Sequence, residues 1–243
     1  MLLFGCEKDL ELNGNNLPKA NLKNYLATYA EDKIADDLFA FAGKSPFFEN
    51  ETPGFPVHIY AIIPDNAVGV RIYSSDSTQF PDSLDLFTQI DFTYELLQDG
   101  FFTRFIDNDT LQDKVIRISY QNADSLHISI PIELKVTSRS SSRLNGIIRE
   151  INSQDYLSFD WSSVPATEFH FLTMSDPAND LVFALITRRS DFSFYDIRFT
   201  ERVLFQAETR PQLQPNYQYR FSVFSISSKG WLNASANNTF TAE

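Results

Sequence analysis

One stretch of this sequence indicates its fold most clearly: residues 213–226, which read LQPNYQYRFSVFSI. Pro215 and Asn216 are typical turn residues, and the run that follows them is rich in Tyr, Phe and Val, which favour strands. A second turn, Ser227-Ser228-Lys229-Gly230, closes the run. The segment therefore predicts a turn, a strand and a turn near the end of an all-β domain.

The residues before this stretch continue the pattern of short apolar runs and turns. Residues 157–161 read LSFDW and predict a strand that ends on Trp161, and residues 169–172 predict the next strand. The polar segment 175–180 supplies the turn after it. Residues 144–243 thus predict one β-sandwich domain of about 100 residues.

This domain resembles a fibronectin type III, or immunoglobulin-like, module. Leu213, Pro215 and Tyr219 are spaced as in that family's tyrosine corner, in which the ring packs inside and the hydroxyl bonds to upstream backbone. Trp161 is similar to the family's buried tryptophan, and Gly230 to its turn glycine. Trp161 and Tyr219 are 58 residues apart, which exceeds the family's usual spacing and predicts an insertion within 181–210.

Residues 25–136 predict a second all-β domain, for which the sequence identifies no family. Strands are expected at 38–42, 57–63, 68–73, 89–97, 100–106, 114–120 and 126–136. The last of these places apolar residues at every second position, and Pro131 within it indicates an edge strand or a bulge, because proline cannot donate to the ladder. Residues 21–36 have helical composition. The chain is thus predicted to hold two tandem β-sandwich domains.

The expected organisation has four parts. Residues 1–24 form the remnant of a signal and a tether, 25–136 an acidic β-sandwich domain, 137–143 a linker and 144–243 the fibronectin type III-like domain. The linker is predicted from its short polar sequence, TSRSSSR.

The charge of the chain is acidic and unevenly distributed. The net charge is −12, of which residues 1–136 carry −11 and residues 137–243 carry −1. An acidic surface repels phosphate backbones, so nucleic-acid binding is not expected.

At the N-terminus, residues 3–6 read LFGC, in which a small residue precedes Cys6, and a charged and Asn-rich tether follows. This pattern resembles a truncated bacterial lipoprotein signal of the Bacteroidetes type. The resemblance implies a lipid on Cys6 that anchors the protein in the outer membrane, with the domains exposed at the cell surface. Phe4 is bulkier than the usual residue, and the charged and apolar parts of such a signal do not precede the motif. The alternative is a free thiol without a role.

No catalytic signature is found, so the sequence predicts that the protein is not an enzyme. His58, His127 and His170 each stand alone in a predicted strand, without metal-ligand spacing. Asp107, Asp109 and Asp113 are a weak calcium candidate because hard oxygens recur there, although Asp and Asn also dominate ordinary turns. No other cofactor is expected. A hydrolase with a hidden pair of carboxyl groups is a third alternative.

Two aromatic residues are candidates for ligand binding. Trp231 follows Gly230 in a predicted loop, where an exposed ring would stack on a sugar or anchor a protein; the alternative is that it folds back over the rim of the sandwich. Tyr217 would extend the same patch. The leading hypothesis is a non-enzymatic cell-envelope lipoprotein that binds or presents a partner. The alternative is a glycan-binding accessory protein of a polysaccharide-uptake system.

Overall fold

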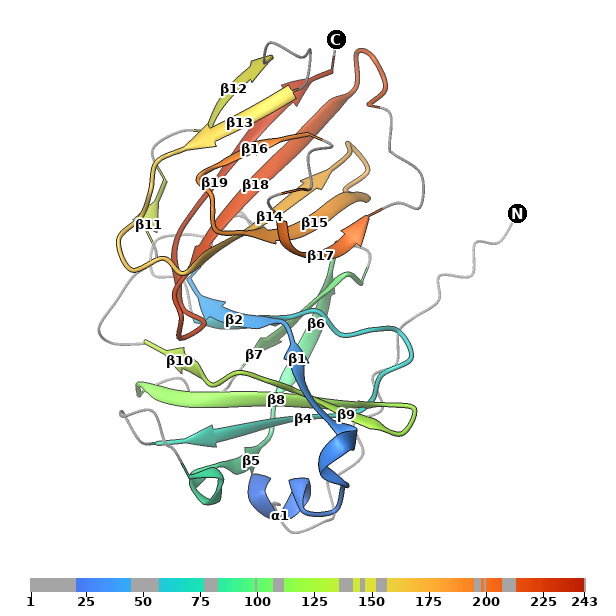
Figure 1. Ribbon diagram of the computed structural model, residues 1–243, viewed down its shortest axis with the longest axis vertical. Coiled ribbons are helices and arrows are strands. Elements are labelled where there is room, and N and C mark those ends of the chain that lie inside the picture. The colour runs from blue at the N-terminus through green and yellow to red at the C-terminus, as the bar shows by residue number, and fades with distance from the viewer. Residues whose placement is uncertain are drawn as a thin grey trace. The chain divides into compact units, whose positions relative to one another are not determined.

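In the structure, a computed structural model, most of the described residues lie in β-strands (Figure 1). The described residues are 21–44, 57–76, 83–98, 100–106, 112–135, 142–144, 147–151, 157–194, 198, 200–206 and 213–242. The elements divide into two compact units, α1 to β10 and β11 to β19. Both units are all-β sandwiches, as the sequence predicted.

The described residues of the first unit form ten strands and three short helices. Its elements are α1 (Leu22–Leu26), η1 (Glu31–Lys33), β1 (Ile34–Leu38), β2 (Ala40–Gly43), β3 (His58–Ala61), β4 (Val68–Ser75), η2 (Leu84–Leu86), β5 (Thr88–Ile90), β6 (Thr93–Leu97), β7 (Phe102–Ile106), β8 (Lys114–Asn122), β9 (Ser125–Ser129) and β10 (Ile132–Leu134). One sheet has the order β1-β9-β8-β4-β5, with β10 also paired to β8, and the other has the order β2-β3-β7-β6.

Two expected strands of the first unit are each divided between the sheets. The run 38–42 breaks at Phe39, after which the chain passes from β1 to β2, and the run 89–97 breaks at Asp91 and Phe92, between β5 and β6. The sequence pattern does not show the crossing, because residues on both sides of each break are typical of strands.

The proline in the expected strand 126–136 marks a bulge. The pairing of β8 with β9 and with β10 is shifted by one residue at Ile130 and Pro131. At this point the backbone N–H of Ile118 donates to the side-chain hydroxyl of Ser129, at 3.0 Å. The bulge thus leaves a buried donor of the ladder with a partner.

The expected helical segment 21–36 is helical only in part. Asn21 caps α1, where its side-chain oxygen accepts from the backbone N–H of Lys23 at 2.9 Å. Leu22 is fully buried, and its backbone N–H donates to the carbonyl of Phe87 at 3.0 Å. Residues 21–24, which were expected to belong to the tether, are therefore part of the folded unit.

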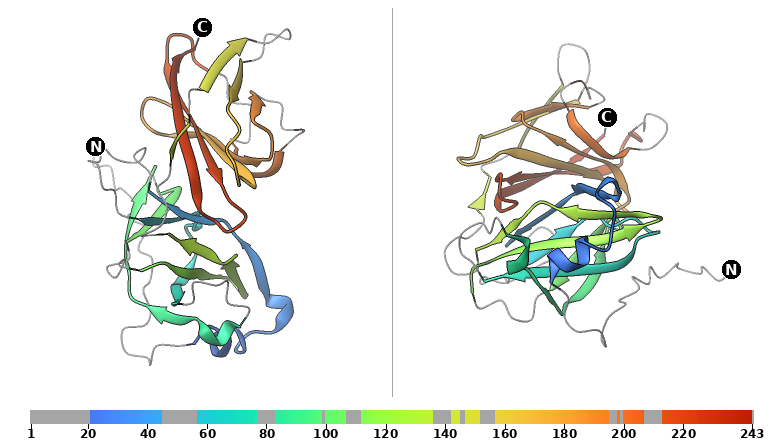
Figure 2. Two further views of the ribbon diagram at one scale, coloured as in Figure 1. Left: turned by 90° about the vertical axis from the view of Figure 1, so that its left-hand side faces the viewer. Right: turned by 60° about the horizontal axis from the view of Figure 1, so that its bottom comes forward.

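The described part of the second unit forms nine strands. They lie in two layers (Figure 2). They are β11 (Ser142–Arg143), β12 (Ile147–Ile151), β13 (Leu157–Trp161), β14 (Phe169–Ser175), β15 (Leu181–Thr187), β16 (Asp191–Ser193), β17 (Thr200–Gln206), β18 (Gln218–Ile226) and β19 (Leu232–Thr241). One sheet has the order β12-β13-β16 and the other β11-β19-β18-β14-β15-β17. β11 lies within the expected linker, so the last two linker residues belong to the sandwich.

The two units follow the same pairing scheme. In one sheet of each unit, two strands pair: β3 with β7 in the first unit, and β13 with β16 in the second. In the other sheet, three strands lie side by side: β4, β8 and β9 in the first unit, and β14, β18 and β19 in the second. Each unit also has a short strand parallel to the final strand of this scheme, β1 on β9 and β11 on β19. This is an immunoglobulin-like arrangement, which also includes fibronectin type III modules. The sequence did not predict it for the first unit.

The extra length of the second unit is explained by β17. This strand pairs with β15 at the edge of the larger sheet and follows β16, so it is an addition to the common scheme. It lies within the segment 181–210, where an insertion was expected.

The tyrosine corner forms as the sequence predicted. The backbone N–H of Gln214 donates to the hydroxyl of Tyr219 at 2.9 Å, and the Tyr219 ring stacks on Phe240 with 6.0 Å between centroids. Trp161 is buried in the same core, which is built around the stacked rings of Phe159 and Phe221, 4.0 Å apart. Gly230 has a φ of +67° in the turn between β18 and β19, a conformation that favours glycine.

Tyr219→Phe removes the corner hydrogen bond and leaves the ring. We expect the free energy of unfolding to fall by about 1 kcal/mol, the net worth of one such bond. Urea unfolding measures the change. Tyr217→Phe is the matched control, since it removes a hydroxyl from an exposed ring and should change stability by less than about 0.5 kcal/mol. Equal effects of the two changes would show that the corner bond contributes nothing specific.

Candidate functional site

The turn before β18 presents the most exposed aromatic side chain among the candidates. Tyr217 is 51% exposed, and its neighbours Pro215, Asn216 and Gln218 are exposed as well. The candidate site is therefore the end of the second unit formed by residues 214–218, which we call the corner turn.

The corner turn is held by its backbone. The backbone N–H of Tyr217 donates to the carbonyl of Gln214 at 3.1 Å. Two further backbone bonds join the turn to Ala242: the N–H of Ala242 donates to the carbonyl of Tyr217, and the N–H of Asn216 donates to the carbonyl of Ala242. Asn216 has a φ of +66°, a conformation that asparagine tolerates better than most residues. With the adjacent corner bond to Tyr219, these contacts keep Tyr217 on a well-ordered turn, which lowers the entropy cost of binding.

Trp231 does not provide the exposed ring that a binding role requires. Its side chain is fully buried. The backbone N–H of Trp231 donates to the hydroxyl of Ser227 at 3.1 Å, and its carbonyl accepts from the backbone N–H of Ser227 at 2.9 Å. The structure therefore agrees with the alternative in which Trp231 folds inward, and only Tyr217 of the expected pair is presented at the surface.

His170 belongs to a buried network that sequence reasoning missed. It is 3% exposed, and its Nδ1 is 3.3 Å from the Trp161 Nε1, which donates to it, and 3.0 Å from the Ser225 hydroxyl. Burial lowers the pKa of His170 to about 4. The imidazole is therefore neutral at pH 7, and Nδ1 is the acceptor that Trp161 requires. The pairing of β14 with β18 places His170 opposite Ser225, which only the fold reveals.

The other two histidines also lie in strands. The Nδ1 of His127 is 2.7 Å from the Asp37 carboxylate, and its ring stacks on Tyr120 with 4.8 Å between centroids. His58 is buried in β3, and burial lowers its pKa.

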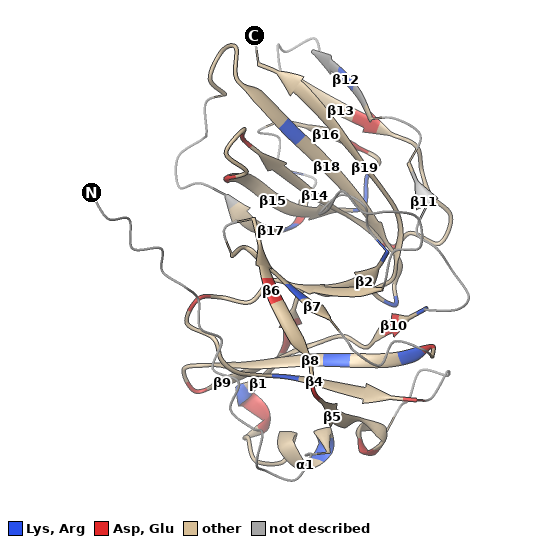
Figure 3. Cartoon of the chain, turned by 180° about the vertical axis from the view of Figure 1, so that it is seen from behind, with Lys and Arg blue, Asp and Glu red and all other residues tan. Residues whose placement is uncertain are grey.

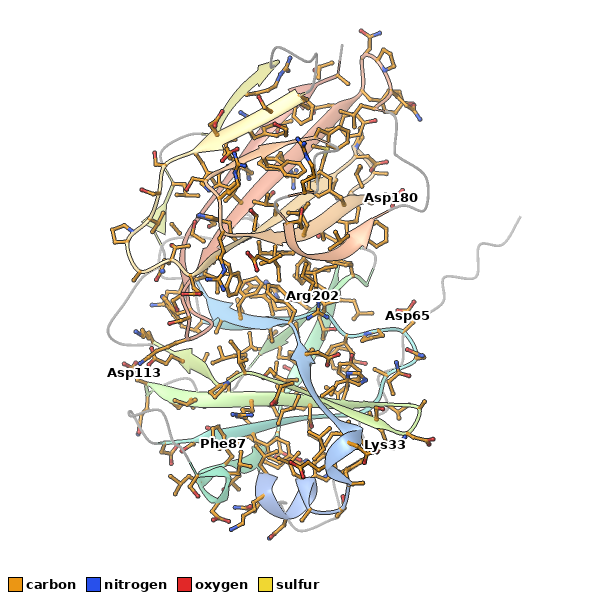
Figure 4. All side chains as sticks on the ribbon, viewed as in Figure 1. Lys33, Asp65, Phe87, Asp113, Asp180 and Arg202 are labelled. Atoms are coloured by element: carbon orange, nitrogen blue, oxygen red, sulfur yellow. The ribbon has the colours of Figure 1, made fainter. Side chains whose placement is uncertain are left out.

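The metal and lipid candidates lie largely outside the described residues. Cys6, Asp107 and Asp109 are not described, and Asp113 is half-buried just before β8, where Figure 4 labels it. Within the described ranges, no three His, Cys, Asp or Glu side chains gather closely enough to hold a metal ion. Nor does the described part of the chain include a helix long and apolar enough to cross a membrane.

Comparisons with known proteins identify no family for this chain. No family model matches it, and no curated protein does. Among solved structures, it is similar to a chain of a cytokine receptor complex (crystal form 1A), with 8% identity over 76% of this chain and 91% of that chain, at a TM-score of 0.29. A score this low supports no conclusion about function, so the immunoglobulin-like assignment stands on the strand pairing described above.

The buried His170 predicts a loss of stability in mild acid. Its pKa is 6.5 in the unfolded chain and about 4 in the folded one, so the unfolded state binds more protons between these values, and stability falls as the pH falls from 6.5 to 4. The full loss is about 3 kcal/mol. Urea unfolding at several pH values measures it.

His170→Asn keeps an acceptor for Trp161 and removes the titration, so its stability should change less with pH over this range. If His170→Asn retains the slope of the natural protein, the pH dependence arises elsewhere.

Proposed function

We propose that this protein is a non-enzymatic lipoprotein of the bacterial cell envelope that binds or presents a partner at the cell surface. A lipid on Cys6 anchors it in the outer membrane, and two immunoglobulin-like sandwiches form the scaffold. The observation that carries the binding role is Tyr217, a half-exposed aromatic ring on a turn held by four hydrogen bonds. Exposed tyrosines on rigid turns supply contact area at a small cost in conformational entropy.

The sandwich architecture suits this role. Loops at the ends of immunoglobulin-like sandwiches are supported by strands that do not need to move, and binding residues are often found there. The charge pattern is compatible with a surface role as well: most of the ribbon in both units is uncharged (Figure 3), and the net charge of −12 favours solubility.

A second candidate function is glycan binding in a polysaccharide-uptake system. The favouring observation is again Tyr217, because an exposed ring stacks on the apolar face of a sugar and its hydroxyl can bond to the sugar's own hydroxyls. Asn216 and Gln218, both exposed beside it, add amide groups that suit the same kind of ligand.

The lipid anchor predicts that Cys6 carries fatty acids in the natural organism. We expect the natural protein to incorporate a labelled fatty acid and to sediment with the outer membrane, and Cys6→Ser to do neither, because serine cannot form the thioether. Metabolic labelling and membrane fractionation measure both. A natural protein without label, or an upstream gene sequence without an in-frame basic and apolar segment, contradicts the anchor.

The binding role predicts that Tyr217→Ala weakens capture of the partner or glycan by about tenfold or more, since it removes an aromatic contact. Glycan arrays and pull-downs from cell-surface extracts measure this. Phe205→Ala, which removes an exposed aromatic ring of the second unit outside the corner turn, is the control and should leave binding unchanged. If the natural protein binds a glycan, and Tyr217→Ala loses this binding while the control keeps it, the second candidate function is favoured. If the captured ligand is a protein, and Tyr217→Ala loses it in the same way, the first is favoured. Binding that Tyr217→Ala leaves unchanged excludes the corner turn as the site.

A further inference from the structure

The face of β4 and β8 beneath α1 gathers four polar side chains. Arg71 and Tyr73 come from β4, and Arg117 and Ser119 come from β8. The antiparallel register sets Arg71 opposite Ser119 and Tyr73 opposite Arg117, so the four form a compact block on one face. We call this block the donor cluster.

Aromatic rings cover the donor cluster. The guanidinium of Arg71 lies over the ring of Tyr25, 4.0 Å from its centroid, and Tyr25 also stacks on Tyr73 with 6.2 Å between centroids. On the other side, the guanidinium of Arg117 lies 5.8 Å from the centroid of Phe87, which Figure 4 labels near α1 and η2. The cover is packed: Leu22, Phe87 and Tyr73 belong to one buried apolar cluster.

The polar atoms of the cluster are buried without matching acceptors. Tyr73 and Ser119 are both 0% exposed. Arg71 and Ser119 are side-chain hydrogen-bond partners of the Tyr73 oxygen and lower its pKa against the larger effect of burial, but no described residue accepts the proton of the Tyr73 hydroxyl or of the Nε of either arginine. Burial raises the pKa of Tyr73 to about 12, so its hydroxyl keeps its proton. Guanidinium nitrogens can only donate, and buried donors without partners are costly.

The charge balance decides which kind of acceptor suits the cluster. The one carboxylate that the described contacts bring near is Asp36, 3.9 Å from Arg117 and 72% exposed, whereas Arg71 faces the ring of Tyr25. A water molecule would satisfy hydrogen bonds without compensating the positive charge. An oxyanion does both, and its interaction with guanidinium groups is strengthened by partial burial.

We propose that the donor cluster is a binding site for one small oxyanion, a phosphate, sulfate or carboxylate group. Arg71 supplies the main charge, the hydroxyls of Tyr73 and Ser119 donate to the anion's oxygens, and the Tyr25 ring forms the outer wall. The site does not depend on the proposed function, because it lies in the first unit and involves neither Cys6 nor the corner turn.

Calorimetric titration of the full chain tests this site, with sodium sulfate, inorganic phosphate and sodium acetate in turn, at constant ionic strength set by sodium chloride. We expect saturable binding of at least one of the three anions with a stoichiometry of one. Arg71→Gln keeps a polar side chain but removes the charge, and it should weaken binding by about tenfold to a hundredfold. Ser119→Ala should weaken it less, since it removes a neutral donor. Preference for acetate over phosphate would identify the natural ligand's group as a carboxylate.

Arg188→Gln, an exposed arginine of the second unit, is the matched control and should bind as the natural chain does. Circular dichroism verifies that each variant is folded, and Ser119→Ala serves alone if Arg71→Gln does not fold. Absence of saturable binding of all three anions to the natural chain overturns the proposal and leaves bound water as the partner of the cluster. Binding that survives in both variants also overturns it.

Discussion

The hydrogen bond between the Gln214 backbone and the Tyr219 hydroxyl holds the entry to β18, the strand on which the second unit depends. β18 pairs on one side with β14 and on the other with β19, and its inward side chains meet the smaller sheet. With Tyr219 fixed inside, the preceding turn places Tyr217 at the surface. The buried Tyr219 hydroxyl thus fixes the turn that carries Tyr217, the candidate binding residue.

Both units cover one exposed strand edge in the same way. A short parallel strand covers the last strand of each pairing scheme, which reduces the edge available for pairing with other chains. The first unit goes further, because α1 and η2 cover the outer face of β4 and β8. That cover buries two hydroxyls and partly buries two guanidinium groups, and it makes the donor cluster a different environment from the solvated outer face usual in antiparallel sandwiches.

The candidate functional residues were identified by two different properties, exposure and burial. Tyr217 stands out by exposure on a rigid turn, whereas His170 and the donor cluster stand out by burial of polar atoms. A binding surface and a buried network place opposite demands on a side chain: the first requires access, and the second requires complete hydrogen bonding. Trp231 shows the difference, since its sequence position indicates a loop but its ring is buried.

The sequence by itself determined the all-β class, the tyrosine corner, an irregularity at Pro131 (an edge or a bulge) and the insertion before residue 210. Each depends on local chemistry: a proline without an N–H, a tyrosine at fixed spacing from a turn, or an excess of length between two markers. Only the tertiary structure decided the matching schemes of the two units, the division of 38–42 and 89–97 between sheets, and the meeting of Tyr25 with Arg71 and of Trp161 with His170. These depend on which strands become neighbours, and pairing between residues distant in the chain leaves no mark in the pattern of either strand alone.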